Sequence, residues 1–165
     1  METYRENSKI TVNNLELVLR PSDGKDIGFV YELMRHHLEN LFNQIPEKWS
    51  RYKFRHGYKT ERITIIEHED MPIGFFDLEI SNDQAYAHNL HISSDYRGRF
   101  IGPYILRYME SEAKKLGVSS IKGKVFRSNQ KFINFLLKNL EYKIESELDE
   151  EKSVLIKKNL EIQNG

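Results

Sequence analysis

A strand, a glycine-bearing loop and a helix follow one another between residues 84 and 117, and this succession constrains the fold most. The strand is expected over residues 86–92, where alternation puts four side chains on one face: Tyr86, His88, Leu90 and Ile92. Pro103 suits the first helical turn, where its missing N–H costs no hydrogen bond, and Gly117 supplies a stop. The pattern predicts a β-loop-α unit within an α/β fold that has a mixed sheet.

The loop between this strand and helix has the features of an anion site. A helix start presents free N–H groups and the positive end of its dipole to one point. Gly98 and Gly102 allow close approach of the chain, and Arg97 and Arg99 add positive charge. An ordinary turn with solvated arginines would explain the same residues, so the loop alone leaves both interpretations open.

Residues 92–102 resemble the acyl-CoA loop of the GNAT N-acetyltransferase superfamily, whose pattern is Gln/Arg-x-x-Gly-x-Gly/Ala after a strand. Arg97 and Gly102 match the two ends of that pattern. Residues 129–135, led by Asn129, look like the second family signature, a helix that packs beside the pantetheine arm. The resemblance covers about residues 15–156 and implies one GNAT domain over residues 1–165, with a predominantly antiparallel sheet, splayed central strands and flanking helices.

The resemblance also implies where acetyl-CoA, the expected cosubstrate, binds. The cofactor lies in a wedge where strand 86–92 and the next strand separate. Backbone groups of Leu90, His91 and Ile92 hold the pantetheine and the acetyl carbonyl, and Asn129 meets the pantetheine arm. The pyrophosphate is held by the main chain of six residues: Arg97, Gly98, Arg99, Phe100, Ile101 and Gly102. An amine then attacks the thioester directly in a ternary complex.

Two residues depart from the family pattern. Phe100 replaces the usual glycine, which we expect to be tolerated only if its backbone adopts an ordinary conformation with the ring directed away. Leu136 stands where a tyrosine commonly protonates the departing thiolate, and Tyr142 is expected to pack as an apolar residue. These departures keep a second function open, a CoA-binding sensor or protein-interaction module that has lost transfer activity.

In the family geometry the face that carries Tyr86 and His88 points toward the acceptor amine. His88 is the candidate general base, because an imidazole can accept a proton near neutral pH, and Tyr86 is a second candidate. A sheet histidine satisfied by its neighbours is the competing explanation. Asp77 and Glu79, on the preceding strand, are further candidates for the base, and they could instead recognise the ammonium of the acceptor.

Residues 40–59 mix aromatic with basic side chains around Pro46 and predict a short or broken helix. Trp49, Tyr52 and Phe54 are expected to wall the acceptor groove. The same mixture can bind nucleic acid through stacking and phosphate contacts, and we favour the acceptor-facing cover.

Composition limits the other functions. Lys plus Arg and Asp plus Glu each total 25, so no net charge attracts nucleic acid or anionic membrane. The absence of cysteine excludes disulfides and thiolate catalysis and suits a cytoplasmic protein. No apolar run approaches the ~20 residues that span a bilayer. Neither His36 with His37 nor His88 with His91 is spaced to chelate one ion, so no metal is expected. Dimers are common in the family, and the sequence leaves a homodimer open.

The remaining elements follow from periodicity. A frayed start should precede a strand over residues 15–20, followed by a helix over about residues 27–38 capped by Ser22. Residues 62–68 and 73–80 predict a hairpin that continues into strand 86–92 as three antiparallel strands. A strand at 121–126 and a helix capped by Ser128 or Asn129 come next. The final hairpin brackets an acidic turn at 145–151 and precedes a loose tail.

Overall fold

The computed structural model describes residues 6–42 and 50–161 of the chain. Its strands are β1 (Ser8–Val12), β2 (Leu15–Pro21), β3 (Ile63–His68), β4 (Met71–Ser81), β5 (Gln84–Ile92), β6 (Ser120–Phe126), β7 (Lys143–Leu148) and β8 (Ser153–Asn159). Its α-helices are α1 (Ile27–Phe42), α2 (Arg51–Gly57), α3 (Ile101–Lys115) and α4 (Gln130–Asn139). No helix in these ranges is long and apolar enough to cross a membrane.

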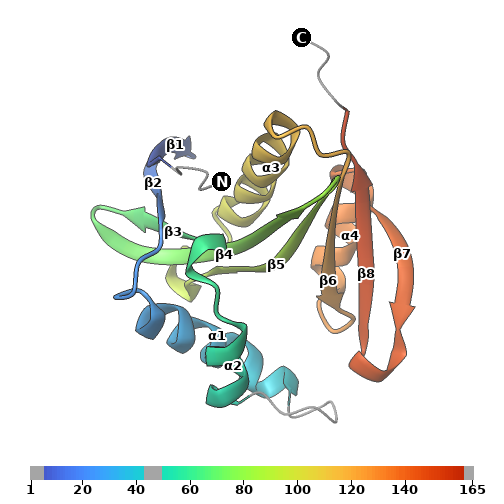
Figure 1. The fold of residues 1–165 in the computed structure, drawn as a ribbon, viewed down its shortest axis with the longest axis horizontal. Helices are drawn as coiled ribbons and strands as arrows, with labels where there is room; N and C mark the ends of the chain where they lie inside the picture. Colours follow the sequence, from blue (N-terminus) through green and yellow to red (C-terminus); the bar gives the residue numbers. More distant parts are fainter. Residues whose placement is uncertain (1–5, 43–49, 162–165) are drawn as a thin grey trace.

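The strands of the described ranges form one sheet in the order β1-β2-β3-β4-β5-β6-β8-β7, in which only β5 and β6 run parallel. Helices α3 and α4 cover one face, and α1 and α2 cover the other (Figure 1). The larger apolar core, under α3 and α4, includes Ile105 and Leu136. The smaller core, under α1 and α2, includes Val30, Phe54 and Phe75. The expected mixed sheet flanked by helices is confirmed.

Strands β3, β4 and β5 form the expected antiparallel meander, because their β-branched and aromatic residues bury both faces of the sheet centre. The chain then crosses through α3 to reach β6, which pairs in parallel with β5 over only four positions, from Gln84 with Ser120 to Ala87 with Gly123. Beyond that point the two strands diverge (Figure 1). The second half of β5 is therefore hydrogen-bonded to β4 alone within the described sheet.

A β-bulge in β5 corrects the predicted strand faces. Asp77 pairs with Asn89, but the next residue, Leu78, pairs with Ala87, so His88 is the extra residue. The bulge interrupts the alternation. Leu90 and Ile92 pack on the core beneath α3, whereas Tyr86 and His88 lie on the α1 face with His91. His88 and His91 therefore share a face, contrary to the prediction from their odd spacing.

The N-terminal region is more ordered than expected. Strand β1 pairs with β2 through a two-residue turn whose residues, Asn13 and Asn14, have φ values of 47° and 69°. Asparagine tolerates this left-handed conformation, which hairpin turns of this length require. Val12 and Leu160 are buried in the larger core, so the core extends beyond residues 15–156 at both ends.

Two smaller predictions are wrong. Ser22 does not cap α1, because its hydroxyl donates to the carbonyl of Thr60 at 2.9 Å. Asp26 precedes the helix instead, and its carboxylate accepts from the N–H of Asp23 and from Arg20. The acidic turn is also shorter than expected, because β7 continues to Leu148 and only residues 149–152 turn the chain.

Candidate functional site

The loop from β5 to α3 presents backbone N–H groups without helical partners. A 3₁₀ turn over Ser94–Tyr96 is followed by Gly98 at φ 76°, and the helix begins at Ile101. The first backbone bond of the helix runs from the Tyr104 N–H to the Phe100 carbonyl at 3.3 Å. The N–H groups of Ile101 and Gly102 therefore precede the helical ladder, and Pro103 has none to satisfy. Arg97 and Arg99, in the same loop, are exposed.

Phe100 does not adopt the ordinary conformation that we expected. Its φ is 61° and its ψ is 16°, which is the left-handed region that the family's glycine would occupy without strain. A non-glycine residue there costs on the order of 1–2 kcal/mol. The ring is 66% exposed, so it is directed toward solvent as expected. The backbone of the loop thus adopts at Phe100 the left-handed conformation that favours glycine.

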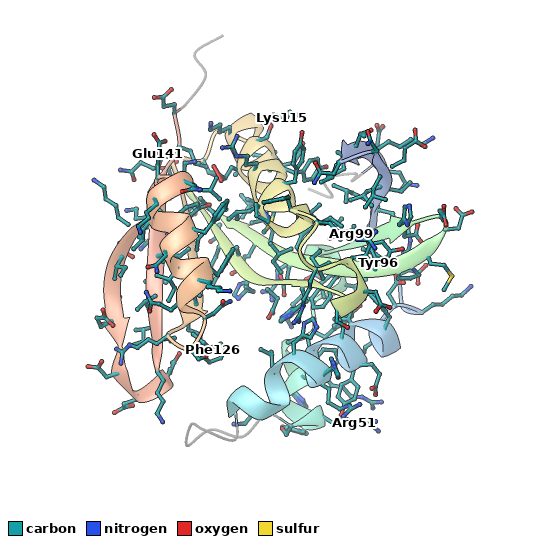
Figure 2. The ribbon with its side chains drawn as sticks, turned by 180° about the vertical axis from the view of Figure 1, so that it is seen from behind. Arg51, Tyr96, Arg99, Lys115, Phe126 and Glu141 are labelled. Atoms are coloured by element: carbon teal, nitrogen blue, oxygen red, sulfur yellow. The ribbon has the colours of Figure 1, made fainter. Side chains whose placement is uncertain are left out.

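Contacts from β1–β2 and β3 hold this loop in place. The side-chain amide of Asn13 donates to the carbonyl of Arg99 at 3.0 Å, and the guanidinium of Arg99 lies 5.0 Å from the ring centre of Tyr96. The hydroxyl of Tyr96 is 2.8 Å from Nδ1 of His68 at the end of β3. Figure 2 shows Tyr96 and Arg99 next to each other below the start of α3. The hairpin that the sequence reading missed is therefore one of the supports of the loop.

The open edge of β5 leads directly into this loop. Leu90, His91 and Ile92 pair with β4 on one side and have no strand partner on the β6 side in the described sheet. Gly74 permits the β4 pairing, because a Cβ there would lie 2.5 Å from the His91 carbonyl oxygen. Across the wedge, Asn129 is exposed at the start of α4 and its side chain makes no capping hydrogen bond. Its amide is therefore available to a ligand.

On the α1 face, His88 and Glu79 form a hydrogen-bonded pair. His88 Nε2 lies 3.0 Å from Glu79 Oε1, and the ring of Tyr86 stacks at 4.5 Å from the imidazole. The bond to His88, first, and the neighbouring Arg62 lower the pKa of Glu79. Because a carboxylate accepts, the neutral imidazole donates from Nε2 and keeps its lone pair on Nδ1. The imidazole is a third exposed, so solvent or a ligand can reach it.

The structure contradicts the expected role of Asp77. Its carboxylate is 4% exposed and accepts from both Nε and Nη2 of Arg62, at 2.9 and 3.0 Å. An ammonium would have to displace this ion pair, so Glu79 is the remaining carboxylate. Trp49 lies outside the described residues. Phe54 is buried against Tyr31 and Tyr58 in the smaller core, so it does not wall a groove.

A pair of histidines that the sequence reading did not connect joins α1 to the open half of β5. His37 Nδ1 lies 3.1 Å from His91 Nδ1, and His91 Nε2 lies 3.3 Å from the amide oxygen of Asn89. Since that oxygen can only accept, His91 donates from Nε2 and accepts from His37. Burial, above all, lowers the pKa of His91 to about 3 and that of His37 to about 4. The pair is therefore neutral near neutral pH.

Leu136, which stands at the position of the missing thiolate acid, is fully buried. The hydroxyl of Tyr142 is buried and donates to Glu110 at 3.3 Å, and Lys158 donates to the same carboxylate at 2.6 Å. Burial and Glu110 raise the pKa of Tyr142. Tyr142 packs as a core residue, as predicted.

The described residues contain no group of three or more His, Cys, Asp or Glu side chains that could hold a metal ion. Helix α2 exposes Tyr52, which stacks on His56 within the same helix, and Arg51 lies over the ring of Tyr31. The basic and aromatic side chains of this region thus contact one another, as in an amphipathic cover.

Residues 30–142 match the sequence model described as "Acetyltransferase (GNAT) family". The chain is also similar to a solved GNAT-family acetyltransferase from Listeria monocytogenes, with 16% identity and a TM-score of 0.68 over 93% of this chain and 100% of that one. The PaiA N-acetyltransferase from Thermoplasma acidophilum, solved with coenzyme A, has 20% identity and a TM-score of 0.67 over 87% of this chain and 98% of that one. The ribosomal-protein-S18-alanine N-acetyltransferase from Escherichia coli has 19% identity and a TM-score of 0.65 over 90% of this chain and 96% of that one. At these identities the structural likeness shows the fold.

Proposed function

The chain belongs to the GNAT family of acetyltransferases, and on that premise we propose that it transfers the acetyl group of acetyl-CoA to an amine by direct attack in a ternary complex. The observation that carries the proposal is the open half of β5, which runs without interruption into the loop that leaves the N–H groups of Ile101 and Gly102 free. A strand edge and a helix start in one line match a thioester arm that ends in a pyrophosphate.

The cofactor's parts are assigned to consecutive segments of this line. Backbone groups of Leu90, His91 and Ile92 hold the pantetheine, and the main chain of residues 97–102 holds the pyrophosphate with Arg97 and Arg99 beside it. Asn129 reaches the arm from the opposite wall of the wedge. Most of these contacts use the main chain, so substitutions such as Phe100 preserve them.

The pair of His88 and Glu79 supplies proton transfer. The amine attacks the thioester carbon, the C–S bond breaks, and the amine's proton passes to Nδ1 of His88 directly or through water. Glu79 stabilises the resulting imidazolium across the 3.0 Å bond. The thiolate leaves without a tyrosine acid, which a thiol with an ordinary pKa near ~8.5 allows. No covalent enzyme intermediate is expected, since the chain has no cysteine.

Amines of low pKa are the preferred acceptors under this proposal. An α-amine with a pKa near ~7.8 is about a tenth neutral at pH 7, whereas a lysine amine near ~10.4 is neutral in only about one molecule in 2,500. A single histidine base can do little to deprotonate the lysine amine. Small metabolites or N-terminal amines are therefore expected to react faster than internal lysines.

Thiol release from acetyl-CoA, measured across amino acids, polyamines, aminoglycosides and N-terminal peptides, tests the proposal. We expect signal with at least one class of low-pKa amine. His88→Ala should lower kcat by roughly 10²-fold, because a positioned base contributes about 10²–10⁴-fold. His56→Ala, which removes an exposed histidine of α2, is the matched control and should leave kcat unchanged.

Leu136 favours one alternative, a CoA-binding module without transfer. The two functions differ in whether thiol is released from acetyl-CoA. Tight CoA binding by calorimetry with no thiol release from any acceptor would establish the alternative, and a lysine preference that survives in His88→Ala would refute the role of the histidine.

A further inference from the structure

A row of charged and polar side chains crosses four strands on the α1 face, beside the wedge. Glu79 of β4 pairs with Tyr86 of β5, Tyr86 pairs with Lys122 of β6, and Lys122 pairs with Lys157 of β8. Tyr86 stands one position before the last β5–β6 pair, at Ala87. The row therefore begins at Glu79, the hydrogen-bond partner of the proposed base His88, and runs away from it across the sheet.

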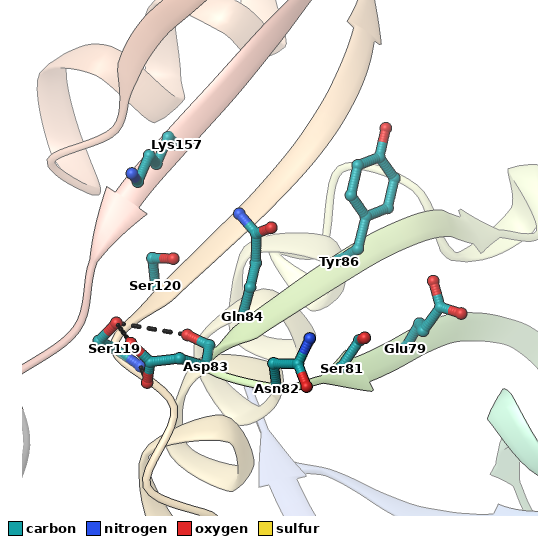
Figure 3. A pocket seen from close by; sticks show the side chains of 9 residues that line it. All are labelled: Glu79, Ser81, Asn82, Asp83, Gln84, Tyr86, Ser119, Ser120 and Lys157. Carbon is teal, nitrogen blue, oxygen red and sulfur yellow. Dashed lines mark hydrogen bonds between the residues drawn. The ribbon is translucent and has the colours of Figure 1, made fainter.

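An open hollow of about 460 Å³ lies over this row. Figure 3 shows Tyr86 and Gln84 rising from β5 on the same side of the sheet, with Lys157 across from them on β8. Its lining includes Glu79, Asp83, Gln84, Tyr86, Ser120 and Lys157. The volume lies within the range of small-molecule sites, and the lining is polar, which suits a small polar ligand.

The carboxylates of the hollow are already engaged. Glu79 accepts from His88 and from Arg62, and Asp83 accepts from the hydroxyl and the N–H of Ser119. A ligand cation would gain little from Asp83, and at Glu79 it would share the carboxylate with His88 and Arg62. The groups of the hollow that can still bind a ligand are therefore not its carboxylates.

The donors at the far end are less engaged. Glu145 lies 2.8 Å from Lys122 but 3.8 Å from Lys157, so Lys122 holds that carboxylate more closely. Ser120 and Gln84 have no side-chain partner within the described part of the chain. One ammonium from β8, one hydroxyl from β6 and one amide from β5 therefore line the hollow. Such a set recognises a carboxylate.

We propose that this hollow is the acceptor site and that Lys157 binds a carboxylate of the acceptor. The site then selects amines whose carboxylate lies about as far from the amino group as in a dipeptide. The inference rests on the proposed function, whose base it places at the opposite end. Two strand spacings of ~4.8 Å put roughly 10 Å between the backbones of Tyr86 and Lys157. An extended dipeptide spans about 7 Å at ~3.5 Å per residue, and the lysine side chain bridges the remainder.

Diglycine and diglycinamide test the assignment, because they share an α-amine of low pKa and differ in the terminal carboxylate. Wild type should show a kcat/KM for diglycine at least tenfold above that for diglycinamide, with the difference in KM. Lys157→Met should abolish this preference by raising the KM for diglycine about tenfold while kcat stays within about twofold. Lys138→Met, an exposed lysine of α4, should behave as wild type. Lys157→Glu should reverse the preference.

A binding measurement separates this inference from the proposed function. Diglycine binding, followed by saturation-transfer NMR without acetyl-CoA, should be seen with wild type and lost in Lys157→Met, with equal melting temperatures for the two proteins. Transfer with no preference for diglycine, or a preference that persists in Lys157→Met, overturns the acceptor site and leaves the transferase standing. Absence of any transfer alongside Lys157-dependent diglycine binding overturns the transferase and leaves the carboxylate site standing.

Discussion

The two halves of β5 belong to one strand but have different neighbouring strands. Residues 84–87 pair with β4 on one side and with β6 on the other, so their main-chain groups are satisfied within the sheet. Residues 89–92 pair with β4 alone, and beyond Gly123 the strand β6 turns away from β5. Gly123 lies at this junction, where a Cβ would come within 3.2 Å of the Ala87 carbonyl oxygen.

Under the proposed function, the paired half of β5 contributes to the stability of the sheet and the open half to ligand binding. The paired half closes the sheet, whereas the open half offers the hydrogen-bonding edge that a strand partner would otherwise use. The open half is held from its α1 face instead, by the bond between His37 and His91. Three substitutions test this division of roles.

The largest effect is expected at the end of the open half. Gly102→Asp places a carboxylate where the pyrophosphate is proposed to bind, and a Cβ at Gly102 meets no atom within 4 Å, so the variant should fold. Calorimetry should show CoA affinity reduced by at least about a hundredfold, because like charges repel and a phosphate contact is lost.

Gly28→Asp is the matched control for this variant. Gly28 is also the second residue of its helix, α1, and also has open space at its Cβ. It should leave CoA affinity unchanged. Unchanged affinity in Gly102→Asp as well would mean that the loop does not hold the pyrophosphate.

The histidine pair that secures the open half should make folding sensitive to acid. The pKa values of His91 and His37 are lowered in the folded chain, whereas unfolded imidazoles titrate near ~6.5. Below that pH the unfolded chain binds protons that the native chain excludes, so the free energy of unfolding falls as the pH drops toward 4. Between pH 6.5 and 5 the loss should be roughly 1–2 kcal/mol for His91 and smaller for His37, which is less buried.

Urea unfolding at pH 7 and pH 5 measures this loss in wild type and in His91→Leu. The variant should lose distinctly less stability between the two pH values, whatever its stability at pH 7. His56→Leu, at an exposed position of α2, should keep the wild-type pH dependence. Equal pH dependence in all three proteins would show that the pair is not a neutral anchor.

The smallest effect is expected from Phe100→Gly. Glycine adopts the φ of 61° without strain, so the free energy of unfolding should rise by roughly 0.5–1 kcal/mol. Glu141→Gly is the control, since Glu141 has a φ of 63° on the far side of α4 and should gain a similar amount. Only Phe100→Gly should also change CoA affinity, by less than about threefold. A loss of stability in Phe100→Gly would mean that the exposed ring contributes contacts that outweigh the strain.

Local patterns determined most of the architecture. Runs of β-branched and aromatic residues predicted the β3–β4–β5 meander, and the succession of strand, glycine loop and proline-started helix predicted the candidate cofactor site. The Asn13-Asn14 pair carried a turn signal that would have predicted the first hairpin. These features depend on residues that are neighbours in the chain, so the sequence by itself contains the information.

Three features were decided by the tertiary structure. The bulge at His88 brought His91 to the same face as His88 and moved Leu90 and Ile92 to the other face, and it arises from the pairing of β5 with β4, which periodicity in one strand does not report. The contact of His37 with His91 joins residues 54 positions apart. Asp77 became an ion-pair partner because Arg62, from the 3₁₀ turn before β3, lies within hydrogen-bond distance of its carboxylate. In each case the outcome depends on which segments pack together, and a burial or charge partner supplied by a distant segment has no signature in the local sequence.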